Sequence, residues 1–262
     1  MSSVRFRTAR DAGLIAGRHL RVLRRSPGRL IYPFAQPLVV LVMMVSVFGN
    51  LALSRGGGAA AGVSYREFLI PGIMIENAAL TAPTTGLALL RDAGSGLADR
   101  FRSLPMSRAA VLIGRLLSDA LVFAAQAVLL VGVGYVLGFR VRSGFPGAVG
   151  IVLVVVLFGL AVAALSAWLA LLINDAETAE RVLFFPAIAL AFVSSAFAPV
   201  ALLAGWMQPI ASVNPVTAAA SVIRSLSSGG GLASSLLWLG CWVVGLFLVP
   251  GALAVRRWQA PT

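Results

Sequence analysis

The apolar stretch GAVGIVLVVVLFGLAVAALSAWLALLI, Gly147–Ile173, decides the fold class of this chain. It carries no charge along its whole length, and a helix needs only about 20 residues to cross the hydrocarbon core of a bilayer. The rest of the chain has the same character, because 59% of its 262 residues are hydrophobic and only 11% are charged. No segment alternates apolar and polar residues as the strands of a membrane barrel do. The sequence therefore predicts an all-α membrane protein.

Six apolar segments can be read along the chain. They run over Leu30–Leu53, Phe68–Leu90, Ala110–Gly138, Gly147–Ile173, Val182–Leu203 and Leu232–Val255. Six transmembrane helices place both termini on one side. We accordingly divide the chain into a segment 1–29, a membrane domain 30–255 with six spans, and a tail 256–262.

The arginines orient these spans. The five on one side are Arg55, Arg66, Arg140, Arg142 and Arg224, and the other sixteen of the 21 belong to the terminal segments and the two loops that share their side. Loops on the cytoplasmic side carry the excess of basic residues. We therefore expect a multi-pass protein of the cell membrane, whether inner or plasma membrane, with both termini in the cytoplasm.

The N-terminal segment has a pattern of its own. Arg18, Arg21 and Arg25 fall on one face of a helical projection, opposite a wide apolar face. This pattern predicts an amphipathic interfacial helix with its arginines near anionic headgroups of membrane lipid. The sequence Ser26-Pro27-Gly28 then breaks the helix before the first span.

Prolines interrupt two of the spans. Pro71-Gly72 and Pro83 lie in the second span and Pro186 lies in the fifth, so both helices are predicted to bend or partly unwind. The region from Pro199 to Leu226 is too hydrophobic for a solvated loop and too broken by proline to cross the membrane.

A re-entrant hairpin of two short helices, dipping from the outer face before the last span, fits that region best. The alternative is a surface loop with one amphipathic helix. The residues that mark the region are Trp206, Asn214, Pro215 and Arg224.

Composition excludes several functions. All 21 basic residues are arginine, and without lysine the chain cannot form a standard phosphate-binding loop for ATP or a Schiff base. A single histidine, His19, and a single cysteine, Cys241, cannot build a His/Cys metal site or an internal disulfide. We expect no metal, no cofactor and no catalytic residue in this chain. The net charge of +12 follows membrane topology, so we expect no nucleic-acid partner.

The loop between the second and third spans contains a short amphipathic pattern. An apolar set (Leu97, Phe101, Leu104) is surrounded by a charged set (Asp99, Arg100, Arg102), with Gly96 at the entry and Pro105 at the exit. Such a helix, lying parallel to the membrane, suits the docking of a cytoplasmic partner. A short solvated connector explains the pattern equally well.

A resemblance favours the docking interpretation. The stretch FLIPGI, which begins at Phe68, and the stretch GLADRFRSLPMSRAAVLIGR, Gly96–Arg115, closely resemble the ABC-2 family of transporter permeases, and within it the daunorubicin-resistance type of drug exporter. SSAFAP from Ser194, WMQ from Trp206 and NPVT from Asn214 are similar to the same branch. The likeness covers nearly the whole chain in order. At Ala204-Gly205 the branch often carries a proline before the tryptophan, which puts the shape of the outer turn in question.

The resemblance implies six spans, an interfacial helix, a coupling helix near Gly96–Leu104 and an outer re-entrant hairpin. It also implies partners: two copies of an ABC ATPase subunit, which bind the ATP and Mg, and a second permease chain, identical or homologous. The coupling helix would rest in a groove of the ATPase and transmit closure of the ATPase dimer to spans two and three.

Two acidic residues fall inside predicted spans, where an ionisable group costs at least about 2.5–3.5 kcal/mol and normally faces the bundle interior. Asp119 has Arg115 one turn before it, so a structural ion pair is favoured. Glu76 has only Asn77 or Thr81 as a partner in its own helix. We take Glu76, Asn77 and Phe68 as candidates for a substrate path. A cross-helix hydrogen bond without a transport role is an equal alternative for Glu76.

These observations lead to one main hypothesis. The chain would be the permease subunit of an ATP-driven multidrug or lipid exporter that moves hydrophobic or amphipathic cargo such as a drug, a lipid or a polyketide-like metabolite. An ion-coupled secondary carrier is the alternative, although it usually needs an internal repeat that is not visible here. An intramembrane enzyme is disfavoured because the chain has no Gly-x-Ser-x-Gly motif and no metal-ligand cluster.

Overall fold

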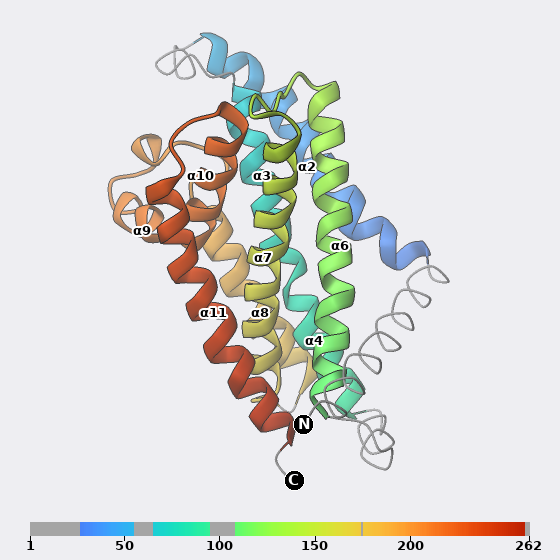
Figure 1. The fold of residues 1–262 in the computed structure, drawn as a ribbon. Coiled ribbons are helices and arrows are strands. Elements are labelled where there is room, and N and C mark those ends of the chain that lie inside the picture. The colour runs from blue at the N-terminus through green and yellow to red at the C-terminus, as the bar shows by residue number, and fades with distance from the viewer. Residues whose placement is uncertain (1–26, 55–64, 95–107, 174, 260–262) are drawn as a thin grey trace.

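The computed structural model describes residues 27–54, 65–94, 108–173 and 175–259 (Figure 1). Within these ranges every regular element is a helix. In chain order they are α2 (Pro27–Ser54), α3 (Tyr65–Thr81), α4 (Pro83–Gly94), α6 (Arg108–Val136), α7 (Gly144–Ala170), α8 (Ala176–Phe192), the 3₁₀ turn η2 (Val200–Leu202), α9 (Gln208–Val213), α10 (Pro215–Ser228) and α11 (Ala233–Gln259). The all-α prediction is therefore confirmed for the described residues.

The long helices form a bundle with α7 inside it (Figure 1). α7 packs against α11, α4, α6 and α10. The ends of α4 and α6 that border residues 95–107 lie at the same end of the bundle as the C-terminal end of α11, which we call the lower end (Figure 1). The turn between α6 and α7 lies at the opposite, upper end.

Four helical stretches are long and apolar enough to cross a membrane. They are Tyr65–Asp92, Ile113–Val136, Gly144–Ala170 and Ala233–Ala254. These match the second, third, fourth and sixth predicted segments. In the first segment the described apolar stretch is Pro33–Val47, which is shorter than the others.

The fifth predicted segment, Val182–Leu203, is helical only in its first part. α8 begins after Asp175, whose carboxylate accepts the N–H of Thr178 at 2.8 Å; that bond holds the pKa of Asp175 below its ordinary value. α8 ends at Phe192, and turns with η2 follow. Beyond Phe192, Ser194 donates to the carbonyl of Ala191 and accepts from the N–H of Ala196, so these two backbone groups are bonded outside a helix.

The proline positions had different effects. α3 stops at Thr81 and α4 starts at Pro83, so the expected break in the second span occurs at Ala82. Proline is well suited to the first position of α4, since it has no N–H to donate. Pro71 and Pro186 lie inside α3 and α8, which continue through them.

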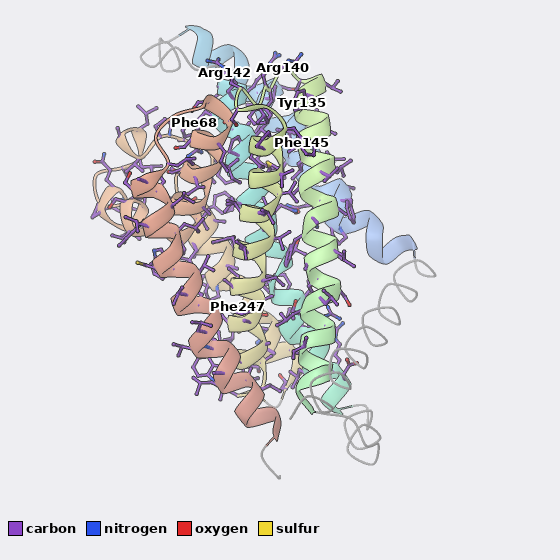
Figure 2. The ribbon with its side chains drawn as sticks, viewed as in Figure 1. Phe68, Tyr135, Arg140, Arg142, Phe145 and Phe247 are labelled. Carbon is purple, nitrogen blue, oxygen red and sulfur yellow. The ribbon has the colours of Figure 1, made fainter. Side chains whose placement is uncertain are left out.

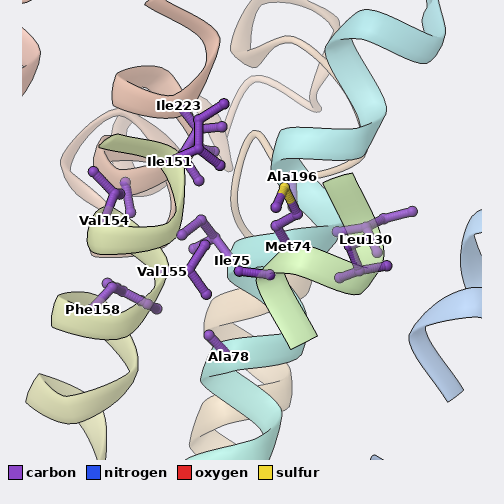
Figure 3. Close-up of a cluster of buried hydrophobic side chains, with 14 of the residues drawn as sticks. Met74, Ile75, Ala78, Leu130, Ile151, Val154, Val155, Phe158, Ala196 and Ile223 are labelled. Atoms are coloured by element: carbon purple, nitrogen blue, oxygen red, sulfur yellow. The ribbon is translucent and has the colours of Figure 1, made fainter. Parts of the chain in front are cut away.

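The interior is apolar and closely packed. Figure 3 shows Met74 and Ile75 of α3 against Val155 and Phe158 of α7 and Leu130 of α6. Where α6 and α7 cross, the ring of Phe123 lies against the backbone of Gly159, and a Cβ on that glycine would be 2.8 Å from the ring. By contrast, only 11% of the apolar window of α11 is buried, so much of that helix presents apolar side chains outward.

Two predicted elements lie outside the described residues: the interfacial helix, apart from its end at Pro27 where α2 begins, and the whole of the segment Gly96–Pro105.

Candidate functional site

α3 carries the candidate path residues along one face. Phe68, Gly72 and Glu76 follow one another at four-residue spacing, which places them on the same side of the helix. Glu76 is 3% exposed and Asn77 is 2% exposed. Glu76 Oε2 and Asn77 Oδ1 have no hydrogen-bond partner among the described residues. Unpaired buried oxygens are costly in an apolar interior, so these two residues are the clearest functional candidates.

Gln126 of α6 adds a third oxygen of this kind. Its Nε2 donates to the carbonyl of Pro33 at 3.0 Å and to Thr81 Oγ1 at 3.4 Å, while its Oε1 has no partner among the described residues. Thr81 lies one turn after Asn77 on α3. Sequence reasoning missed Gln126, although a glutamine inside an apolar span is a visible signal.

Arg224 connects α10 to α3 and to the end of α8. Its Nε donates to the carbonyl of Phe68 at 3.1 Å, and its guanidinium carbon lies 3.7 Å from the centre of the Phe68 ring. Nη1 donates to Ser195 Oγ at 3.1 Å and Nη2 donates to the carbonyl of Ser195 at 2.6 Å. Arg224, predicted to mark the outer region, and Phe68, predicted to line a path, are in contact in the structure.

Asn214 and Pro215 begin α10. The Asn214 carbonyl oxygen Oδ1 accepts from the N–H of Val216, and Pro215 takes the first helical position. Asn214 Nδ2 donates to the carbonyls of Leu190 and Val193, at 2.8 and 2.6 Å, where α8 ends. Trp206 lies apart from this group and is 68% exposed. The predicted marker residues therefore divide, with Asn214, Pro215 and Arg224 in the bundle and Trp206 on its surface.

Polar side chains also gather at the upper end. Arg142 pairs with Glu67 at 3.3 Å, and Arg66 donates to the carbonyl of Leu137 at 3.1 Å. Arg140 lies over the ring of Tyr135 at 5.4 Å (Figure 2). These residues border the apolar bundle, as charged and aromatic residues do at a membrane surface.

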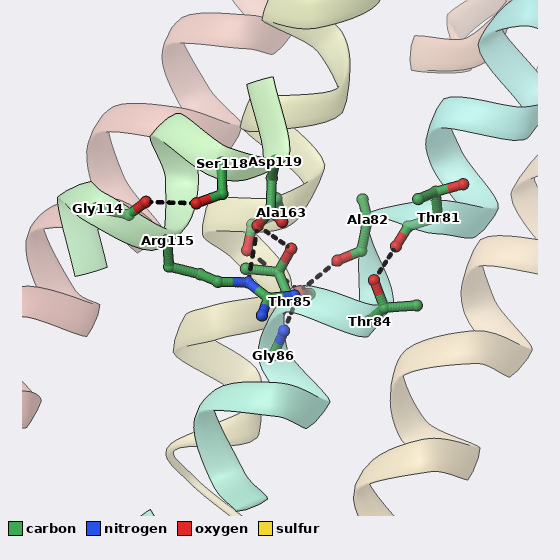
Figure 4. Close-up of polar contacts among 11 residues, drawn as sticks. Thr81, Ala82, Thr84, Thr85, Gly86, Gly114, Arg115, Ser118, Asp119 and Ala163 are labelled. Carbon is green, nitrogen blue, oxygen red and sulfur yellow. Dashed lines mark hydrogen bonds and ion pairs between the residues drawn. The ribbon is translucent and has the colours of Figure 1, made fainter. Parts of the chain in front are cut away.

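A second polar group braces the start of α4 (Figure 4). Asp119 Oδ2 accepts from Arg115 Nε at 3.2 Å and from Thr85 Oγ1 at 2.7 Å, so the expected Arg115–Asp119 pair is present and includes Thr85. Ser166 of α7 donates to the carbonyl of Ala82 at 3.0 Å and accepts from the N–H of Gly86 at 3.1 Å. The break in the second span is thus bonded to both α6 and α7.

We expect Asp119→Ala to destabilise the protein by about 3 kcal/mol, the low end for breaking a buried ion pair, because the side chains of Arg115 and Asp119 are only 17% and 13% exposed and the change leaves Arg115 and Thr85 without their acceptor. Thermal unfolding in detergent measures this change. Glu177→Ala is the matched control, because Glu177 and Arg181 also form an i,i+4 pair but with side chains 74% and 75% exposed. The midpoint temperature of unfolding of Glu177→Ala should hardly differ from that of the parent protein. Equal losses in both variants would contradict the assigned role of burial.

The polar side chains described above can bind a solute or hold neighbouring backbone in place. Among the described residues no cluster of three His, Cys, Asp or Glu side chains is placed to hold a metal ion. The groups available for such binding and support are the acceptor oxygens of Glu76, Asn77 and Gln126, unpaired among the described residues, and the donors of Arg224. They can hold a backbone in place or contact a passing solute.

Comparison with known proteins shows which protein family this chain is related to. Residues 12–227 match the family model of the ABC-2 type transporter. The chain is 32% identical, over 90% of its own length and 78% of the relative's, to the daunorubicin resistance ABC transporter permease protein DrrB1 of Streptomyces coeruleorubidus. It is 31% identical, over 84% of its length and 79% of the relative's, to the probable doxorubicin resistance ABC transporter permease protein DrrC of Mycobacterium tuberculosis. The putative transport permease ycf38 of Cyanophora paradoxa is 26% identical, over 79% and 70% of the two chains. With this match and its apolar helices, the chain is a membrane permease that belongs to the ABC-2 type transporter family.

Proposed function

We propose that this permease moves hydrophobic or amphipathic cargo out of the cell, powered by a separate ABC ATPase. The observation that carries the proposal is the family match together with the complete absence of lysine. A standard ATP-binding loop reaches the phosphates with a lysine, so the energy has to enter from a partner chain. The names of the relatives, daunorubicin and doxorubicin resistance permeases, support a drug-like cargo.

The proposed complex contains two copies of the ATPase and a second permease chain. The segment Gly96–Leu104 is its docking element, and its apolar side chains fill a pocket on the ATPase. The bracing of α4 by Asp119 and Ser166 supports this proposal, because movement of the segment that follows α4 would be passed directly to α6 and α7.

Co-expression with an ABC ATPase subunit tests the proposal. The two chains should co-purify in mild detergent, and membranes with both should hydrolyse ATP and export daunorubicin, used as a fluorescent probe. Membranes with the permease alone should do neither. Daunorubicin movement driven by a proton gradient without any ATPase would instead favour an ion-coupled carrier.

The proposal keeps six spans, with α2 and α8 as the first and fifth and α9–α10 as the outer re-entrant hairpin. We expect a reporter fused after Gln259 to label from the cytoplasm and reporters inserted at Gly57 or Gly144 to label from outside, because the excess of arginine holds its loops inside. Impermeant labelling of intact cells measures this. Labelling of Gly57 only from the cytoplasm would exclude both the six spans and their orientation.

Glu76 is the proposed contact with cargo or with the partner permease. We expect Glu76→Ala to change the export of cargo, or the stimulation of ATP hydrolysis by cargo, while the complex still assembles. The reason is that Glu76 supplies a buried polar oxygen that has no partner among the described residues. Transport and co-purification are measured together. Ala78→Ser, also buried on α3, is the control for a small change inside the helix. Normal export by a well-expressed Glu76→Ala protein would make Glu76 a structural residue.

A further inference from the structure

The backbone between α8 and η2 is not helical although it is buried. We call residues 193–197 the link; Ser194, Ser195 and Ala196 in it are at most 4% exposed. In an apolar bundle, non-helical backbone persists only if other groups satisfy its N–H and C=O groups. The partners of the link are therefore informative.

Those partners come mainly from one helix and its cap. Thr217 and Arg224 belong to α10, lie seven residues apart and share a face, and Asn214 caps the same helix. Thr217 Oγ1 accepts from the N–H of Ser195 at 2.9 Å. Asn214 donates to the carbonyl of Val193, and Arg224 donates to the carbonyl of Ser195. α10 thus replaces the helical partners that the link has lost.

The other side of the link lies on α3. A Cβ built on Gly72 would lie 1.8 Å from the carbonyl oxygen of Ala196, so only glycine allows this approach. Gly72 is one turn before Glu76 on the same face of α3. The link therefore covers the α3 face next to Glu76, on the side towards the upper end, and Figure 3 shows Ala196 beside Met74.

Arg224 is the residue that joins all three parts. It bonds to the link through both Ser195 oxygens and to α3 through the Phe68 carbonyl and ring. Among the described residues it forms no ion pair with a carboxylate, so its charge is balanced by carbonyl and hydroxyl dipoles and an aromatic face. A guanidinium suits this role, because its planar fork can bond to two backbone carbonyls and stack on a ring together.

We propose that Arg224 is a positioning residue that latches the link onto Gly72, and that the latched link closes the upper end of the α3 face carrying Glu76. The link leaves this position during transport; that last statement rests on the proposed export function. The contact of Arg224 with the link does not rest on that function, because it is present in the permease without ATPase or cargo.

The first test measures how fast a thiol introduced into the link reacts. Cys241 is exposed and is the chain's single cysteine, so Cys241→Ser gives a silent background. Ser194→Cys then places a thiol in the link at a position that is 1% exposed and whose side chain bonds to the carbonyl of Ala191 rather than to Arg224. N-ethylmaleimide is added to the purified permease in detergent. With Arg224 present the reaction should be slow, because the thiol reacts only when the link opens.

Arg224→Gln should raise the reaction rate of the thiol at position 194 by about tenfold or more, since it removes charge-assisted bonds to the link. Arg224→Lys should give an intermediate rate, because an ammonium cannot form the bidentate arrangement. Ser118→Cys is the matched control: Ser118 is 2% exposed on α6 and bonds to the carbonyl of Gly114 within that helix. The rate at position 118 should be unchanged by Arg224→Gln. Unchanged reactivity at position 194, or an equal rise at both positions, would overturn the latch.

The second test uses the complex with the ATPase. The Ser194→Cys protein should react faster when ATP, Mg and vanadate trap the complex than without nucleotide, while the Ser118→Cys protein should not change. Equal rates at position 194 in a complex that hydrolyses ATP would overturn the role of the link in transport. A complex with no ATP hydrolysis would count against the proposed function alone, because the first test still decides whether Arg224 is a latch.

Discussion

A protein with Phe101→Ala is expected to lose both its ATPase partner and export. In the proposed complex Phe101 is the aromatic anchor of the docking segment, with Leu97 and Leu104 beside it. Buried aromatic anchors carry most of the free energy of an interface, commonly about 2 kcal/mol or more on truncation to alanine. Co-purification of the ATPase and export of daunorubicin from cells measure the two losses.

Arg102→Ala is the matched control in the same segment. An arginine at the rim of an interface contributes only about 0–1 kcal/mol, so its loss should matter less than that of Phe101. Membrane insertion should be normal in both variants, because the segment is predicted to lie outside the bilayer. Retention of the ATPase with normal export by Phe101→Ala would exclude the coupling role of Gly96–Leu104.

Gly72→Ala is expected to destabilise the folded bundle strongly, although it adds only one methyl group. The added Cβ would overlap the backbone of Ala196, at 1.8 Å from its carbonyl oxygen and 2.8 Å from its Cα. Overpacking typically costs about 1–3 kcal/mol. We expect the upper end of that range, because the link cannot retreat while Arg224 holds the Ser195 carbonyl. Thermal unfolding in detergent measures the change.

Gly132→Ala provides the comparison. A Cβ on Gly132 of α6 would have nothing within 4 Å, and alanine is the better helix former by about 0.5–1 kcal/mol. This variant should be as stable as the parent or slightly more so. If Gly72→Ala unfolded at the same temperature as Gly132→Ala and left a thiol introduced by Ser194→Cys unreactive, the close contact between α3 and the link would be wrong.

The predicted spans succeeded where composition and length decide the outcome. The segment 68–90 corresponds to α3 and α4 together, and the segments 110–138, 147–173 and 232–255 correspond to α6, α7 and α11. A long apolar segment in a membrane has to satisfy its own backbone, so apolar length alone predicts a helix. The pair Arg115–Asp119 was predictable for another local reason, because a four-residue spacing on one helix brings two side chains together.

The segment 182–203 shows where this reasoning stops. It is apolar throughout most of its length, yet α8 ends at Phe192 and the chain continues as the link. Apolar composition predicts that the backbone of a segment is buried. That backbone has to be helical only when no other group of the protein can bond to its N–H and C=O groups. Here α10, which follows in sequence, supplies those groups. The path candidates Glu76 and Asn77 stay predictions, with burial and unpaired oxygens in their favour.

The sequence by itself determined that this chain enters a membrane as helices and that four of its apolar segments are long enough to span it, and it shows that the chain contains no lysine. These are properties of each segment and its solvent. Only the tertiary structure decided that Arg224 meets Phe68 and Ser195, and that Gly72 lies under Ala196. Those contacts join residues as far as 156 positions apart, and they depend on how three helices pack, which no local pattern of residues encodes.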